Sequence, residues 1–149
     1  MNKFFPVKIL ACILLMNGFA ASSELKEFTS DGCSLFPDGT MADRSQWCDC
    51  CFQHDITYWR GGSKEERNAA DNALRVCVLE RTGNTALANA MYTGVRMGGS
   101  PVFPTWYRWG YGWIYGRGYK TLSNEEQKQV ASMFELYKNK YPAGYCRKK

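Results

Sequence analysis

The sequence has one histidine and no hydrophobic run long enough to cross a membrane. His54 is the single histidine among 149 residues, so imidazole chemistry can occur at one position only. The apolar stretch at residues 9–20 is shorter than the roughly 20 residues that a membrane-spanning helix needs. Internal repeats, low-complexity tracts and linkers are also absent. These absences favour a single domain over a membrane-spanning or modular protein.

The first residues have the features of a secretory signal peptide. Lys3 and Lys8 precede the apolar stretch, and small residues up to Ser22 follow it. We expect residues 1–20 to be removed, with residue 22 as the latest cleavage point. The remaining single domain, residues 21–149, is predicted to be secreted to the periplasm or the medium.

Basic residues are too few and too dispersed for a nucleic-acid-binding protein. Loss of residues 1–20 leaves 17 basic and 14 acidic residues, a formal net charge of +3. The one basic run lies at residues 147–149. A small positive excess helps at an anionic lipid surface, but it is also ordinary for a solvated surface. Nucleic acid is therefore not an expected partner.

Six cysteines remain after the predicted cleavage, an even number in an exported chain. An oxidising compartment favours three disulfides, for which 15 pairings are possible. The alternative is a zinc site made by Cys48, Cys50, Cys51 and His54. Adjacent cysteines do not easily face one tetrahedral ion, and no second CxxC pair is present. Disulfides are the favoured interpretation.

Helix and turn signals predict a mainly α fold without convincing strands. The expected helices cover residues 43–60, 64–83, 85–97 and from Ser123 to just before Pro142. Ser63 and Ser123 each stand three positions before a glutamate, which is the signature of a capping box. Residues 98–119 are rich in Gly, Pro, Trp and Tyr and are expected to form an irregular segment.

The histidine and a distant aspartate are predicted to meet across the first two helices. The glycine pair at residues 61–62 is expected to turn the chain back so that these helices lie antiparallel. His54 stands seven residues before this turn, and Asp71 eight residues after Ser63, which is about 10 and 12 Å of helical rise. At this matching height the carboxylate is able to bind one imidazole nitrogen and stabilise the imidazolium.

A purely structural role for this pair is the alternative. A lone histidine beside an acid is most often a satisfied polar pair, and Asp71 alone is typical of an acid early in a helix. The coincidence of several features favours a site. The same register brings Cys77 level with Cys50 and Cys51, so that one disulfide is able to lock the two helices together.

Two stretches resemble the signatures of the secreted phospholipase A2 superfamily. Residues 50–58, CCFQHDITY, are similar to its Cys-Cys-x-x-His-Asp run that ends in tyrosine. Residues 70–78, ADNALRVCV, resemble its second signature, in which an aspartate precedes a cysteine by six positions. The resemblance implies two antiparallel core helices cross-linked by disulfides, in a short, divergent, bacterial-type member. The implied disulfides are Cys33–Cys51, Cys50–Cys77 and Cys48–Cys146.

The resemblance implies a role for each matching side chain. His54 would be the general base for a water that attacks the sn-2 ester of a glycerophospholipid. Asp71 would orient His54, and Tyr58 would hydrogen-bond Asp71. Asp55 would supply carboxylate oxygens to calcium, which prefers hard oxygen ligands and stabilises an oxyanion. The expected partner is a phospholipid membrane surface or micelle, engaged by a monomer.

The loop ahead of the first core helix is the candidate for the rest of the calcium site. By the resemblance, the carbonyls of Gly32, Ser34 and Phe36 would be ligands, and the Ser34 amide would donate to the oxyanion. The family's glycine-rich spelling is replaced here by Leu-Phe-Pro-Asp, so that Asp38 is a further candidate ligand. The alternative is a disulfide-anchored turn that binds no ion.

Aromatic side chains dominate residues 106–119, and three interpretations are open. Tryptophan and tyrosine favour membrane interfaces, and the two arginines there are able to meet phosphates. The same side chains are also suited to an aromatic platform for sugars, or to ordinary core packing. On a scaffold without turnover, this segment would make the chain a non-catalytic module that binds membranes or glycans.

Overall fold

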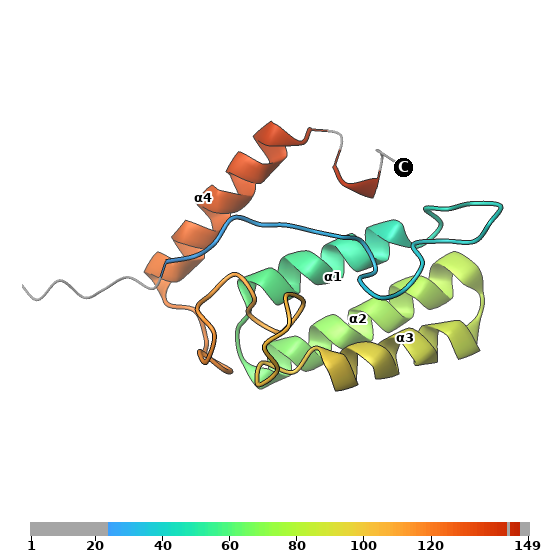
Figure 1. The fold of residues 1–149 in the computed structure, drawn as a ribbon, viewed down its shortest axis with the longest axis horizontal. Helices are drawn as coiled ribbons and strands as arrows, with labels where there is room; N and C mark the ends of the chain where they lie inside the picture. The colour runs from blue at the N-terminus through green and yellow to red at the C-terminus, as the bar shows by residue number, and fades with distance from the viewer. Residues whose placement is uncertain (1–23, 143, 147–149) are drawn as a thin grey trace, which may run out of the picture.

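Four helices form the described part of the chain, which is residues 24–142 and 144–146 of a computed structural model. The predicted signal peptide and residues 147–149 lie outside it. The helices are α1 (Cys48–Arg60), α2 (Lys64–Thr82), α3 (Thr85–Gly98) and α4 (Asn124–Lys140). The first three lie side by side and alternate in direction, while α4 packs across the extended N-terminal segment (Figure 1). No strand occurs in the described residues, which confirms a mainly α fold.

The first helix begins five residues later than the sequence indicated. We predicted a start at Asp43, but α1 starts at Cys48 and the preceding residues form turns. The Asp43 carboxylate accepts hydrogen bonds from the Ser45 amide at 3.0 Å and the Ser45 hydroxyl at 3.1 Å. Aspartate and serine compete in this way with helical hydrogen bonds, so the predicted start is wrong.

The ends of α2 and α4 follow the sequence signals. At the start of α2 the Ser63 hydroxyl accepts from the Glu66 amide at 3.2 Å, and the Glu66 carboxylate accepts from the Ser63 amide at 2.7 Å. The same reciprocal pair, Ser123 and Glu126, opens α4. Gly83 ends α2 in the left-handed conformation. Both predicted capping boxes are confirmed.

The turn between α1 and α2 requires glycine at residue 61. Gly61 has φ 68° and ψ −159°, a region that is essentially open to glycine alone. A Cβ on Gly61 would lie 2.9 Å from the Cα of Gly110, which packs against the turn. This close approach lets the Gly110 amide donate to the Tyr58 carbonyl at 2.6 Å. The aromatic segment is thereby fixed to the helical hairpin that carries His54.

Replacement of Gly61 by alanine is expected to lower the free energy of unfolding by about 2–4 kcal/mol, from backbone strain and the clash with Gly110. Gly83→Ala is the matched control, because Gly83 also has positive φ but an added Cβ meets nothing within 4 Å. That change should cost about 1 kcal/mol. Urea denaturation of both variants measures the difference; equal losses would contradict the close approach.

Three disulfides connect the helices to the segments around them. They are Cys33–Cys51, Cys50–Cys77 and Cys48–Cys146. This pairing, which the resemblance implied, is confirmed, and it excludes a zinc site on these cysteines. Disulfides are typical of proteins in an oxidising compartment. Among the described residues, no helix has the length and apolar character needed to cross a membrane.

Part of the aromatic segment, residues 106–119, belongs to the core. Trp109 and Trp113 are fully buried. Their indole N–H groups donate to the carbonyls of Gly62 at 3.0 Å and Arg60 at 2.7 Å, at the end of α1 and in the turn. Core packing is therefore confirmed for these two tryptophans. Trp106, in contrast, keeps 65% of its surface exposed.

Candidate active site

The histidine and the distant aspartate meet across α1 and α2 as predicted. His54 Nε2 lies 2.9 Å from Asp71 Oδ1, and both side chains are buried. Tyr58, one turn after His54, donates its hydroxyl to the same oxygen at 2.6 Å. The Cys50–Cys77 disulfide joins the two helices with a Cα–Cα distance of 5.7 Å, about a turn from this contact. This disulfide thus fixes how α1 and α2 are aligned, and with it the contact between His54 and Asp71.

Two arginines that the sequence analysis did not identify also surround Asp71. Arg96 on α3 donates from Nη1 to Asp71 Oδ2 at 2.7 Å, and Arg67 Nε lies 3.7 Å from that oxygen. Arg67 is one helical turn before Asp71, so the i,i+4 spacing gave a signal for it. Arg96 is 25 residues from Asp71 in the sequence and reaches it through the packing of α3 on α2. No local pattern indicates that contact.

The Asp71 carboxylate is held in its ionised form. Burial alone would raise the pKa of Asp71, but hydrogen bonds from His54, Tyr58 and Arg96 outweigh burial and keep the pKa below its ordinary value. An ionised carboxylate only accepts hydrogen bonds. His54 Nε2 therefore carries a hydrogen and donates a hydrogen bond to Asp71, and in the neutral imidazole this leaves the lone pair on Nδ1. This is the tautomer that a general base needs.

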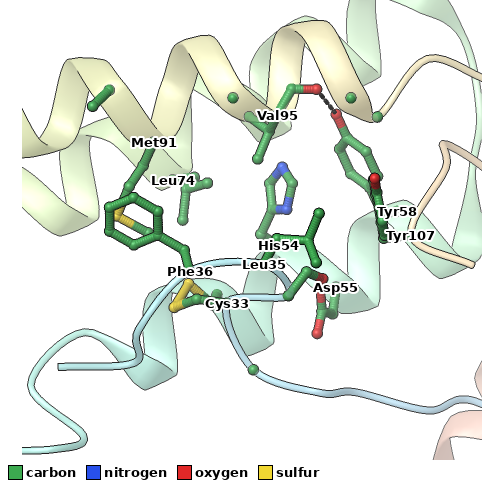
Figure 2. A pocket seen from close by; sticks show the side chains of 17 residues that line it. Cys33, Leu35, Phe36, His54, Asp55, Tyr58, Leu74, Met91, Val95 and Tyr107 are labelled. Atoms are coloured by element: carbon green, nitrogen blue, oxygen red, sulfur yellow. Dashed lines mark hydrogen bonds between the residues drawn. A yellow bond between two sulfur atoms is a disulfide. The ribbon is translucent and has the colours of Figure 1, made fainter. Parts of the chain in front are cut away.

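An apolar cavity of about 280 Å³ opens beside His54. Figure 2 shows the imidazole inside it, with Phe36 and Met91 toward one end and Tyr58 and Tyr107 toward the other. Its lining comes from α1, α2, α3, the loop at residues 32–36 and the aromatic segment. The volume is near the lower end of the range for small-molecule sites, which suits one slender apolar chain better than a bulky ligand.

The predicted calcium residues lie on the wall of this same cavity. Asp55 and the loop residues Gly32, Ser34 and Phe36 all line it together with His54. The Cys33–Cys51 disulfide ties the loop to α1 beside these groups. No group of three or more His, Cys, Asp or Glu side chains forms a metal cluster in the described residues. A cation here would accordingly depend on one carboxylate and on backbone carbonyls.

Asp55 is a buried carboxylate in surroundings that disfavour its charge. It keeps 8% of its surface exposed. The hydroxyl of Ser30 donates to its Oδ2 at 2.6 Å. Burial raises the pKa of Asp55 well above its ordinary value, the Ser30 hydrogen bond lowers it, and the charges of Asp31 and Asp38 raise it further. A bound cation would remove this cost, so the residues present fit a hard metal ion such as calcium.

Asp38, the further candidate ligand, stabilises the loop at residues 32–36 by a hydrogen bond. Its Oδ1 accepts from the Cys33 amide at 2.8 Å. A Cβ on Gly32 would overlap this carboxylate, which explains the glycine with φ 78° at that position. Ser34 also has a positive φ of 44°, so the loop is held in an unusual backbone conformation beside Asp55.

The arrangement has the parts of an acyl-transfer site. An imidazole that is oriented by Asp71 lines an apolar cavity. A buried carboxylate and a constrained backbone loop lie on the wall of that cavity, where cation binding and oxyanion stabilisation would be needed. No protein-family model matches the chain, and neither a curated protein nor a solved structure matches it significantly.

Proposed function

We propose that the chain is a secreted, calcium-dependent hydrolase of the phospholipase A2 superfamily that cuts the sn-2 ester of glycerophospholipids. The observation that carries this proposal is the buried His54–Asp71 pair at 2.9 Å, which opens onto an apolar cavity. A phospholipid supplies both an ester for the imidazole-activated water and an acyl chain for the cavity. The enzyme is proposed to work as a monomer at a membrane surface or micelle.

His54 acts as base and then as acid in the proposed reaction. Its Nδ1 accepts a proton from a water as the water oxygen attacks the sn-2 carbonyl. Asp71 stabilises the resulting imidazolium through Nε2–H, and Tyr58 holds the accepting oxygen in place. When the tetrahedral intermediate collapses, the imidazolium returns its proton to the departing alkoxide. The products are a fatty acid and a lysophospholipid, and no covalent intermediate forms.

Calcium is proposed to be held by Asp55 and the backbone carbonyls of Gly32, Ser34 and Phe36. When bound, the ion would supply positive charge for the ester carbonyl and the oxyanion that develops from it. The Ser34 amide is the proposed N–H donor to the same oxyanion, and the described residues give it no hydrogen-bond acceptor. The raised pKa of Asp55, caused chiefly by burial, supports this assignment.

Vesicle hydrolysis tests the proposal directly. The mature chain is incubated with unilamellar phosphatidylcholine or phosphatidylglycerol vesicles, in calcium or in chelator, and both products are quantified. We expect fatty acid and lysophospholipid in equal amounts, formed with calcium only. Release that continues in chelator would contradict the calcium mechanism. Binding to vesicles or glycans without hydrolysis would instead support the non-catalytic module.

Exposed apolar side chains would serve membrane binding in either candidate function. Leu35 on the cavity wall is 79% exposed, and Trp106 is 65% exposed. The Trp106 indole donates to Asp31 at 3.2 Å, which joins the aromatic segment to the loop. These side chains suit a lipid interface whether or not turnover occurs. Product formation, and not vesicle binding, therefore separates the two functions.

Residue 94 offers a test of the cavity as the acyl-chain site. Gly94 lines the cavity, and an added Cβ would meet nothing within 4 Å. Leucine at this position should fill the space of the chain and lower kcat/KM for long-chain phospholipids by roughly 10–100-fold relative to short-chain esters. Ala86→Leu, at an exposed α3 position that does not line the cavity, is the control. An unchanged long-to-short ratio in Gly94→Leu would place the acyl chain elsewhere.

A further inference from the structure

The two oxygens of the Asp71 carboxylate have separate partners. Oδ1 lies 2.9 Å from His54 Nε2 and accepts from the Tyr58 hydroxyl at 2.6 Å. Oδ2 accepts from Arg96 Nη1 at 2.7 Å. Arg67 Nε, at 3.7 Å, is too distant for a hydrogen bond to Oδ2. Arg96 therefore occupies the side of the carboxylate that the dyad leaves open.

We propose that Arg96 is a positioning residue of this site, which holds the Asp71 carboxylate ionised and turned so that Oδ1 stays on His54. Its effect on hydrolysis rests on the function proposed above, whereas its effect on the imidazole does not. Asp71 is fully buried, and a buried carboxylate is costly without a charged partner. A neutral His54 supplies no such charge. Positive charge comes from Arg67, whose Nε lies 3.7 Å from Oδ2, and from Arg96, which alone of the two makes a short, charge-assisted hydrogen bond to it.

Arg67 also binds several groups other than Asp71, which makes Arg96 the clearer test. Arg67 is 3% exposed, and its guanidinium donates to the carbonyls of Val95 at 3.0 Å and Arg96 at 2.9 Å, near the C-terminal end of α3. It also donates to the hydroxyls of Tyr58 and Tyr119. Its removal would leave several buried acceptors without a donor. The Arg96 side chain is 29% exposed, and its described hydrogen bond goes to Asp71 alone.

The kinetic test compares Arg96→Gln with Arg96→Lys. We expect Arg96→Gln to lower kcat by roughly 10–100-fold, because a small displacement of the dyad is enough for such a loss. KM should change by less than about twofold, since Arg96 does not line the cavity. Lysine keeps the charge with a different geometry, so Arg96→Lys should recover most of the loss. Arg75→Gln, which removes a half-buried α2 arginine that contacts Asn72 and lies over the Tyr92 ring but does not contact Asp71, is the matched control.

The imidazole spectrum supplies a readout that does not require activity. Because His54 is the only histidine, every ¹H–¹⁵N imidazole signal in the spectrum belongs to it. We expect the Nε2–H signal to be shifted or lost in Arg96→Gln, nearly restored in Arg96→Lys and unchanged in Arg75→Gln. Arg96→Met replaces the Gln variant if that variant does not fold, because it keeps the aliphatic stem.

A folded neutral variant with a wild-type imidazole spectrum and wild-type kcat would overturn the positioning role. If the wild-type protein hydrolyses no phospholipid, the proposed function fails and the spectrum alone decides the role of Arg96. Loss of the Nε2–H signal in that case would still support positioning, whereas an unchanged signal would still overturn it. Thermal unfolding of each variant separates these outcomes from a loss of fold.

Discussion

Replacement of His54 by glutamine is expected to lower phospholipid hydrolysis by roughly 10²–10⁴-fold, the usual contribution of a general base. The reason is that the two imidazole nitrogens have different roles. Nε2 is bound to Asp71 at 2.9 Å, which leaves Nδ1 for the proton of the attacking water. The glutamine amide is able to donate to Asp71 in the same way, but it has no basic nitrogen. Fatty-acid release from vesicles at saturating calcium measures the loss.

The fold and the cation site should survive this substitution. Because the amide keeps a donor toward Asp71, the buried carboxylate does not lose that partner, and the thermal midpoint should stay close to wild type. Calcium should raise the midpoint of His54→Gln as it does that of the wild type. Hydrolysis at the wild-type rate in a folded His54→Gln protein would exclude the imidazole as the base.

Local spacing was enough to predict the centre of the site. A helix rises 1.5 Å per residue, so the distances of His54 and Asp71 from the glycine turn fixed their heights once the helices were taken as antiparallel. The predicted capping serines marked the start of α2 and α4 correctly for a similar reason, because a cap depends on a side chain three residues away. Interactions between residues that are close in the chain can therefore be predicted from the sequence alone.

Features that depend on packing between distant segments were not predictable in this way. Arg96 reaches Asp71 only because α3 lies against α2, and the sequence contains no periodicity that pairs them. Composition likewise could not divide the aromatic segment into the buried Trp109 and Trp113 and the exposed Trp106. The start of α1 was missed because the Asp43 carboxylate forms a local turn that competes with the helix.

Replacement of Asp55 by asparagine is expected to abolish both hydrolysis and the stabilisation of the protein by calcium. A ligand at 100 times its dissociation constant adds about 2.7 kcal/mol to the free energy of unfolding. For the wild type this is a rise of several degrees in the thermal midpoint. The asparagine side chain of the variant would offer one neutral amide oxygen in place of the carboxylate, so the rise should vanish. Asp31→Asn, which removes an exposed neighbouring charge outside the proposed ligand set, should keep it.

The same substitution has an opposite effect on the protein without calcium. Because burial raises the pKa of Asp55 in the folded state, the stability that its neutral form provides at low pH is lost as pH rises above the ordinary value. Near neutral pH the burial of Asp55 therefore opposes folding, while the asparagine carbonyl of the variant would still accept from Ser30. We expect calcium-free Asp55→Asn to unfold at a higher temperature than calcium-free wild type at pH 7. A lower midpoint, or a calcium-induced rise equal to that of the wild type, would show that the ion binds elsewhere and that Asp55 serves the fold.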